Sequence, residues 1–503
     1  MKQSDYFFNK IENINLRLIK IIPKSNNIKI RVIKDMFVIN SGLFNSYFFL
    51  LKNNFFYSAH ILFRTIFERS LFLEFILLNK YDINKRTHLF YYSSRLRNLL
   101  WISKLMDNDR CIYYLLNDNI INSDDLCLIN NLIKKRISKE QKLFKNEVYN
   151  AHYCNICDFK HDERKKVWYR TNKNIFYDSV TINNLSDLSN YIFDHNNKIN
   201  YSFFYGLSSV YTHGFYVDNW DALNSIPKIN DMCLYTNLVL YLCFRNIQLI
   251  CCNLLDNIDK DLSNKVLSLE KEMDIFLNNY DKKNYSDFKL KIPSKNFTNN
   301  FKMKYFKEQV INLYNSYYFL RKYDRNEAAK IISRTIFQSS LNLKYIIDFP
   351  YKRERFKLFC LSSRLQIIFN ILKVASDDKK LYLNSIKNNL LNEYDFTGIK
   401  FVQFKIINLD KKRQKWFLID KEKFSKLNMT VSSLRELSSL VFPKMSDLYY
   451  TYMYGFNSVY SHGIDLNSTI YFLNYKYNKI IKSISNIKIL DKLISNLFNE
   501  INI

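Results

Sequence analysis

The chain has 503 residues and a formal net charge of +28, from 75 lysines and arginines against 47 aspartates and glutamates. Hydrophobic residues make up 48% of the sequence and aromatic residues 17%, which excludes an intrinsically disordered chain. Only 6 glycines and 5 prolines are present, which argues against an all-β fold with frequent turns and against a glycine-rich nucleotide loop. The composition therefore predicts an all-α protein.

Apolar residues recur at three- and four-residue steps along several segments, and this period predicts long helices. The pattern is clearest over residues 59–78, where the apolar stripe is wide enough for a helix buried on most sides. Residues 123–145 and 431–440 show the same period. β-Branched and aromatic residues concentrate over 168–181 and 400–419, where we expect short extended pieces.

Five short blocks of the sequence occur twice. Lys104 and Lys373, which follow the third block in each occurrence, also correspond. Blocks 45–50, 64–67, 93–96, Trp168 and 205–214 recur in the same order as 315–320, 334–337, 362–365, Trp416 and 454–463. The same order throughout predicts a tandem duplication. We expect a first helical domain over 1–257, a connector over 258–300 and a second homologous helical bundle over 301–503.

The cysteines do not suggest a secreted disulfide framework. Four of the nine lie in one hydrophobic stretch: Cys233, Cys243, Cys251 and Cys252. Small apolar thiols suit a reduced core, and no signal peptide opens the chain, so we expect a cytoplasmic protein. The most membrane-like window, 233–255, contains Asn237 and Arg245 and predicts a buried helix rather than a membrane span.

The two Tyr-Gly to His-Gly blocks hold the first candidate residues. Four of the six glycines lie in them: Gly206, Gly214, Gly455 and Gly463. The first glycine of each block would allow close helix approach, and the last would end a helix directly after His213 or His462. A histidine in a last helical turn has its imidazolium form favoured by the helix dipole. Two interpretations stay open, a helix-capping histidine and a ligand-facing one.

A second set of candidates lies on the helix predicted before residue 78. His60, Arg64 and Glu68 share one helix face, and only the arginine is retained among their counterparts in the second copy, which are Lys330, Arg334 and Gln338. An acid–base pair of arginine and glutamate is therefore not the shared chemistry. We assign His213, His462, Arg64 and Arg334 as candidate catalytic residues.

Other side chains that occur in both copies are hydrogen-bond donors, and none of them is a carboxylic acid. They are Arg95, Arg364, Lys104, Lys373, Tyr205, Tyr454, Ser209 and Ser458, which we assign to phosphate binding. If these groups converge, each copy forms a pocket for a phosphate or another oxyanion, and no metal or other cofactor is expected. Arginines bonded to helix ends or acidic side chains are the alternative.

One cluster has ligand types suited to zinc. His152, Cys154, Cys157 and His161 are closely spaced, but the second copy has no equivalent group. We treat them as a weak metal candidate, with incidental clustering as the favoured interpretation.

The order Arg, Ser-x-Arg, Trp and Tyr-x-Leu-Ser-x-x-x-x-His-Gly resembles a widespread bacterial family of uncharacterised helical proteins, one of the numbered domains of unknown function. Both copies look like members, although the second has Phe456 and Asn457 where the first has Leu207 and Ser208. The resemblance implies a helical fold and no established reaction.

A looser similarity is to the HEPN superfamily of helical bundles, found in toxins and phage defence, many of which are metal-independent ribonucleases. Their hallmark arginine, a few residues before a histidine on one helix, is missing before both His213 and His462. The resemblance implies RNA chemistry in which arginines reach the histidines only through the fold.

We therefore expect a basic, two-domain protein of bacterial defence or toxin type that binds RNA or nucleotide phosphate, which its net charge also favours. Metal-independent endoribonuclease activity is a further hypothesis, and a second copy of the chain is a further candidate partner. The alternative is a non-enzymatic helical scaffold whose repeated arginines and histidines are structural. Peripheral membrane association rests on charge and aromatic content alone.

Overall fold

Nearly all residues that the structure describes belong to helices. The computed structural model describes residues 2–117, 122–150, 168–169, 182, 184–193, 205–212, 228–254, 260–284, 299–349, 351–372, 377–401, 431, 433–457 and 486–501. Within these residues no strand forms, only single-residue bridges at Ile182 and Val431, and the prediction of an all-α fold is confirmed.

We call residues 1–257 the N-terminal half and residues 301–503 the C-terminal half. One long helix, α11 (Lys260–Asn284), lies between them in the chain. The N-terminal half contains α1 (Lys2–Ile21), α2 (Ile28–Lys52), α3 (Phe56–Leu77), α4 (Ile83–Met106), α5 (Asp109–Asn117), α6 (Ser123–Asn150), α7 (Leu185–Ile192), α8 (Gly206–Thr212) and α10 (Lys228–Leu254). After α11, the C-terminal half contains α12 (Asn299–Lys322), α13 (Asn326–Asp348), α14 (Lys352–Leu372), α15 (Asp377–Phe401), α16 (Leu434–Val441), α17 (Ser446–Leu448), the π-helix η5 (Tyr449–Phe456) and α20 (Ile487–Ile501).

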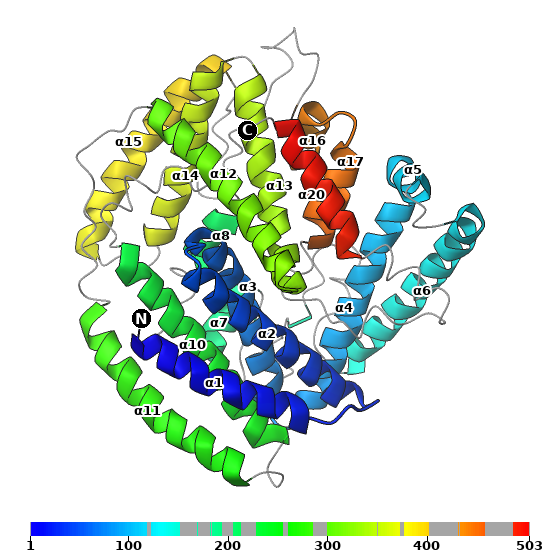
Figure 1. Ribbon diagram of the computed structural model, residues 1–503, viewed down its shortest axis with the longest axis vertical. Coiled ribbons are helices and arrows are strands. Elements are labelled where there is room, and N and C mark those ends of the chain that lie inside the picture. Colours follow the sequence, from blue (N-terminus) through cyan, green and yellow to red (C-terminus); the bar gives the residue numbers. More distant parts are fainter. Residues whose placement is uncertain are drawn as a thin grey trace.

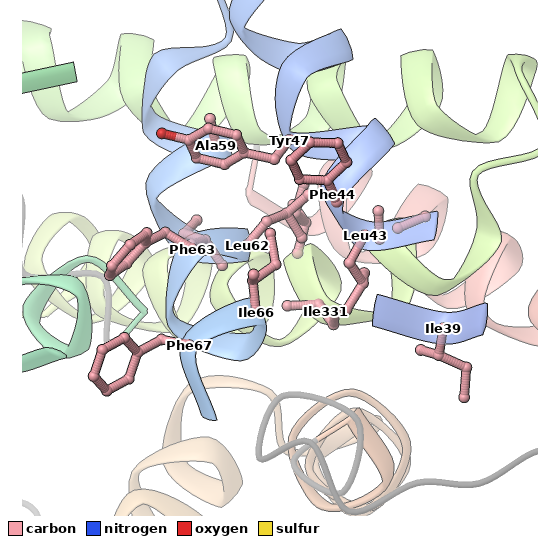
Figure 2. Packing of buried hydrophobic residues seen from close by; sticks show 14 of the residues in the cluster. Ile39, Leu43, Phe44, Tyr47, Ala59, Leu62, Phe63, Ile66, Phe67 and Ile331 are labelled. Carbon is pink, nitrogen blue, oxygen red and sulfur yellow. The ribbon is translucent and has the colours of Figure 1, made fainter. Parts of the chain in front are cut away.

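The two halves pack against each other along one central layer. Helices α2, α3, α12 and α13 lie in the middle of the molecule, with α4 and α6 on one flank and α14 and α15 on the opposite flank (Figure 1). In the core, side chains of α2, α3 and α13 interdigitate, as Figure 2 shows for Leu43, Leu62 and Ile331. Helix α3 is buried along its length from Ser58 to Leu77, as the broad apolar stripe predicts.

The same turn joins α2 to α3 in the N-terminal half and α12 to α13 in the C-terminal half. Asn54 has φ 61° and Asp324, 270 positions later, has φ 53°, a left-handed conformation that asparagine and aspartate tolerate better than most residues. In both turns the next backbone N–H donates to a carbonyl five residues back over 2.9 Å, from Phe55 to Leu50 and from Arg325 to Leu320. Two segments far apart in the chain thus adopt one local structure.

A second pair of local structures matches at the offset of 249. Asn184 caps α7 by accepting from the backbone of Asp187 over 3.0 Å, and Ser433 caps α16 by accepting from Glu436 over 3.2 Å. The predicted helix over 431–440 therefore begins at Leu434. Most of the expected extended pieces lie outside the described residues, although Lys400 and Phe401 belong to α15.

Contacts between the halves are reciprocal, as in a two-fold symmetric dimer. Phe49 of α2 stacks on Phe319 of α12, which is its own counterpart in the repeat, with ring centroids 4.9 Å apart. Phe55 packs on Phe319, and Arg325, the counterpart of Phe55, packs its guanidinium over Phe49 at 4.2 Å. A residue and its counterpart meet in this way when an approximate two-fold axis passes between them.

The remaining long helices cover the N-terminal half. Helix α10 contains a segment, Tyr235–Leu254, long and apolar enough to cross a membrane, and it packs against α1 and α3 with 56% of that segment buried. This agrees with the expected buried helix, whereas the cytoplasmic location stays a prediction. Helix α11, within the predicted connector, packs on α1 and α10, and ion pairs such as Lys10–Glu272 at 2.8 Å join it to α1.

The first glycine of each Tyr-Gly block contacts the opposite half. A Cβ at Gly206 would lie 2.7 Å from Cγ of Asn370 on α14, so the predicted close approach is confirmed there. Gly455 faces Trp101 on α4, where a Cβ would make an ordinary contact at 3.5 Å. Trp101 also donates to the Thr451 carbonyl over 2.9 Å.

We expect Gly206→Ala to destabilise the protein by about 1–3 kcal/mol, because overpacking forces α8 away from α14. The matched change Gly455→Ala should be neutral or stabilising by up to about 1 kcal/mol, since the site has room and alanine favours helix. Urea unfolding of both variants measures the difference. Asn370→Ala should reduce the cost of Gly206→Ala in a double-mutant cycle, and equal effects of the two alanines would contradict this packing.

Candidate functional site

Arg64 lies at the centre of the molecule in a closed set of hydrogen bonds. The side chain is only 3% exposed. Its Nε donates to Glu68 over 3.2 Å and one terminal nitrogen donates to the Tyr205 hydroxyl over 2.9 Å. Tyr205 in turn donates to the same Glu68 oxygen over 2.7 Å, and Ser209 accepts from Arg64 over 3.4 Å. Glu68, set aside on sequence grounds because Gln338 replaces it, is thus the partner of the retained arginine.

Burial alone would lower the pKa of Arg64. The negative charge of Glu68 and the hydrogen bond to Tyr205 outweigh burial and raise this pKa above its usual value. Burial is also the main reason why the pKa of the Tyr205 hydroxyl is raised. Arg64 therefore stays charged and Tyr205 stays protonated across the physiological range.

Arg334 occupies the equivalent place in the C-terminal half. It is 2% exposed, lies over the Tyr454 ring at 4.9 Å and hydrogen-bonds with that tyrosine, as Arg64 lies over Tyr205 at 5.0 Å. Burial lowers the pKa of Arg334; Tyr454 opposes this, the nearby Arg64 lowers it further and Glu68 raises it. The two halves thus bring their retained arginines close enough to repel each other, where the sequence predicted two separate pockets.

Arg97 of α4 belongs to the same neighbourhood. Its side chain is half-buried, and burial lowers its pKa while Tyr169 and Glu68 raise it. We name Arg64, Arg97 and Arg334, with Glu68, Tyr205 and Tyr454, the arginine cluster. Its described side chains carry three positive charges and one negative charge.

Arg95 does not join the arginine cluster, contrary to the expected convergence. Arg95 and Arg97 are two residues apart on α4, so they project from nearly opposite faces of the helix. Arg95 forms an ion pair with Glu140 of α6 over 2.9 Å and donates a hydrogen bond to the Tyr91 hydroxyl over 2.9 Å. Glu140, which is fully buried, also pairs with Arg136 over 2.8 Å. Arg95 therefore joins α4 to α6 as a structural group.

The other predicted phosphate ligands are spread over the surface or fall outside the described part of the chain. Lys104 is exposed in the last turn of α4 and Arg364 is half-buried on α14. Outside the described residues lie His213, His462, Lys373, Ser458 and the four zinc candidates His152, Cys154, Cys157 and His161. Within the described residues, no group of three or more histidines, cysteines and acids could hold a metal ion.

The segment leading to His213 is held beside the arginine cluster. Thr212, the last residue of α8, is 1% exposed, and its carbonyl accepts a hydrogen bond from Thr335 over 3.1 Å. Thr335 follows Arg334 in the chain. Helix α8 therefore connects Tyr205 of the cluster at one end with the position before His213 at the other.

The geometry gives the arginine cluster one clear chemical capacity. Guanidinium groups and tyrosine hydroxyls donate hydrogen bonds to an anion, and the planar guanidinium fork matches the oxygens of a phosphate. Glu68 is occupied by Arg64 and Tyr205, so the described side chains of the cluster offer no unengaged carboxylate as a general base. Comparison of the repeats did not identify Arg97, because its counterpart is Gln366. The sequence feature that could have identified it is its position two residues after Arg95, which places it on the other face of the same helix.

Part of the chain matches a known protein family. The chain matches no curated protein and no solved structure. The family match begins within α2 and ends before α10, so it covers most of the N-terminal half and includes Arg64, Arg95, Trp168 and His213. Residues 32–225 match the model of a family of unknown function, DUF5677.

Proposed function

We propose that the chain is a tandem duplication whose two copies join at the arginine cluster, and that this cluster binds the phosphate of RNA or of a nucleotide. The duplication is supported by the recurring sequence blocks, the identical turns at Asn54 and Asp324, and the stacking of Phe49 on Phe319. One composite site at the joint then replaces two separate pockets.

The observation that carries the anion site is the charge count at this joint. Arg64 and Arg334 are almost fully buried and Arg97 is half-buried, with Glu68 the one carboxylate among the described cluster residues. Unbalanced charge in a protein interior costs free energy, because water no longer solvates it. A bound phosphate would offset the excess positive charge and accept hydrogen bonds from the arginines.

The two halves contribute unequally to this site. The N-terminal half supplies Arg64, Glu68 and Arg97, while the C-terminal half supplies Arg334 and has Gln338 and Gln366 at the other two positions. Because glutamine stands at the position of Glu68, the C-terminal half adds a cation to the arginine cluster and no acid at that position. Arg97 keeps part of its side chain accessible and would meet an entering anion first.

The catalytic step is a further part of the proposal. His213 follows α8 and His462 follows η5 in the chain, so both histidines come shortly after a tyrosine of the cluster. A histidine that transfers protons beside arginines that stabilise a phosphate meets the needs of RNA cleavage through the 2′-hydroxyl without a metal. Such a reaction would fit the looser HEPN similarity and a role in bacterial defence or as a toxin.

A non-enzymatic scaffold is the second candidate, and the closed bonding of Arg64 is the observation that favours it. Under this alternative the arginine cluster only holds the halves together, as a buried ion pair whose loss is costly. The two candidates differ in what an added anion does to the stability of cluster variants.

We expect Arg97→Gln, which introduces the residue of the C-terminal half, to weaken binding of 5′-AMP and inorganic phosphate at least tenfold, because one guanidinium contact is lost. Titration calorimetry on the full chain measures this. Lys85→Gln, at an exposed position on the same helix, removes the same charge and should leave the affinity unchanged. Equal affinities of wild type and Arg97→Gln, or no binding by wild type, would remove the proposed site.

We expect Glu68→Gln to destabilise the protein by about 3–5 kcal/mol, because it leaves Arg64 without its buried partner. If the cluster binds anions, added phosphate should restore much of the lost melting temperature and stabilise this variant more than wild type. A pure scaffold predicts the same initial loss with no selective rescue. Sodium chloride at equal ionic strength is the control for general screening.

For the catalytic step, we expect the double variant His213→Ala and His462→Ala to lose RNA cleavage measured in the presence of a chelator. General acid–base catalysis by histidine contributes about 10²–10⁴-fold to rate, so the loss should be at least a hundredfold. RNA binding by the double variant, measured in parallel, separates catalysis from affinity. Equal cleavage by both proteins would sink the catalytic part while leaving anion binding untouched.

A further inference from the structure

Helix α6 presents a row of lysines to solvent. Its exposed lysines are Lys134, Lys135, Lys139, Lys142 and Lys145. Lys135, Lys139 and Lys142 follow the i, i+4, i+7 spacing that places side chains along one helix face. We name these five residues the lysine face of α6. At 1.5 Å per residue it extends over about 16 Å.

The acidic residue in the middle of α6 does not neutralise this face. Glu140 is fully buried and is held by Arg95 and Arg136 on the side that packs on α4. Ile133 and Phe144 are buried on the same side. Among the described side chains, only Lys134 of the lysine face forms an ion pair, with Asp107 at 3.4 Å. Among the described charged side chains of α6, Glu140 therefore lies inward and the five lysines lie outward.

The described side chains of α15, the equivalent helix of the C-terminal half, do not show this arrangement. In α15, the described lysines are engaged locally, with Lys380 paired to Asp377 over 2.7 Å and Lys387 donating to Asn384 over 3.0 Å. Glu393 of α15 pairs with Lys357 of α14 over 2.9 Å. General basicity of the chain does not explain why one of two corresponding helices concentrates exposed lysines.

We propose that the lysine face of α6 is a docking surface for the sugar–phosphate backbone of a polynucleotide. Over about 16 Å one strand of a duplex carries about five phosphates, one per 3.4 Å, which matches five lysines on one side of a helix. Lysine acts as a point charge towards phosphate and reads no sequence, so the expected binding is independent of base sequence. This surface is separate from the arginine cluster, and it extends the proposed function from a single phosphate to a polymer.

The attachment of α6 makes the surface rigid relative to the arginine cluster. Arg95 joins Glu140 to α4, and Arg97, two residues along α4, contributes to the cluster. Lys104, exposed in the last turn of α4, adds a further cation on that helix. A strand held on α6 would thus be bound beside the helix that also carries a cluster arginine.

The test compares two triple variants of the full chain that lose the same charge. Lys135→Gln with Lys139→Gln and Lys142→Gln removes the centre of the lysine face. Lys80→Gln with Lys265→Gln and Lys271→Gln removes three exposed lysines elsewhere. The probe is a fluorescent double-stranded RNA of 20 base pairs and mixed sequence, titrated at several salt concentrations. Circular dichroism confirms folding of both variants.

We expect the α6 variant to bind the RNA at least tenfold more weakly at 0.15 M salt. The slope of log affinity against log salt should fall by about 3, since each of three lost phosphate contacts on a duplex contributes about 0.9. The control variant should keep most of the wild-type affinity. Equal loss in the two variants, or an unchanged slope in the α6 variant, overturns the proposal.

Two further measurements distinguish the lysine face from the arginine cluster and from a membrane-binding surface. Binding of 5′-AMP should be the same in the α6 variant and wild type, so a failed arginine cluster and a failed lysine face give different results. Flotation with vesicles containing phosphatidylserine tests a membrane partner. If the α6 variant loses vesicle binding while RNA binding stays at the wild-type level, the lysine face is a membrane surface and the polynucleotide proposal is wrong.

Discussion

Arg64 and Arg334 lie where α3 packs against α13, and removing their guanidinium groups from water costs free energy that neighbouring groups must offset. Glu68 and Tyr205 offset it for Arg64 through a closed set of hydrogen bonds. Arg334 has Tyr454 beside it, and it lies near enough to Arg64 and Glu68 to feel both charges. These bonds require Tyr205, directly before α8, and Tyr454 of η5 to approach the joint between α3 and α13.

Similar backbones in the two halves support different chemistry. The turns at Asn54 and Asp324 and the caps at Asn184 and Ser433 are local structures whose hydrogen bonds need few specific side chains. The charged groups differ instead, since glutamine replaces both a cluster acid and a cluster arginine in the C-terminal half. The charges at the joint are therefore asymmetric, whereas two identical halves related by a two-fold axis would repeat each charge on both sides of it.

Much of the fold could be predicted from local patterns. The period of apolar residues identified the buried α3, and the recurring blocks identified the segments that share turns and caps. The prediction that Gly206 permits close helix approach was correct, because glycine in so glycine-poor a chain marks a place where a Cβ does not fit. Gly455 shows the limit of this reasoning, since its site has ordinary room for a Cβ. The repeat did not indicate that Arg95 pairs with Glu140, because that partner lies on α6 and not within the recurring blocks.

The sequence by itself determined the helical class, the repeat and the identity of the two retained arginines with their tyrosines, because each depends on spacing within short segments. Only the tertiary structure decided that Arg64 and Arg334 lie near each other, that Glu68 bonds with Arg64, and that Arg97 rather than Arg95 lies near Glu68. These facts depend on which helices pack together across some 270 positions of chain, and packing is selected by the fit of whole surfaces. The spacing of residues within one helix does not indicate which other helix will pack against it.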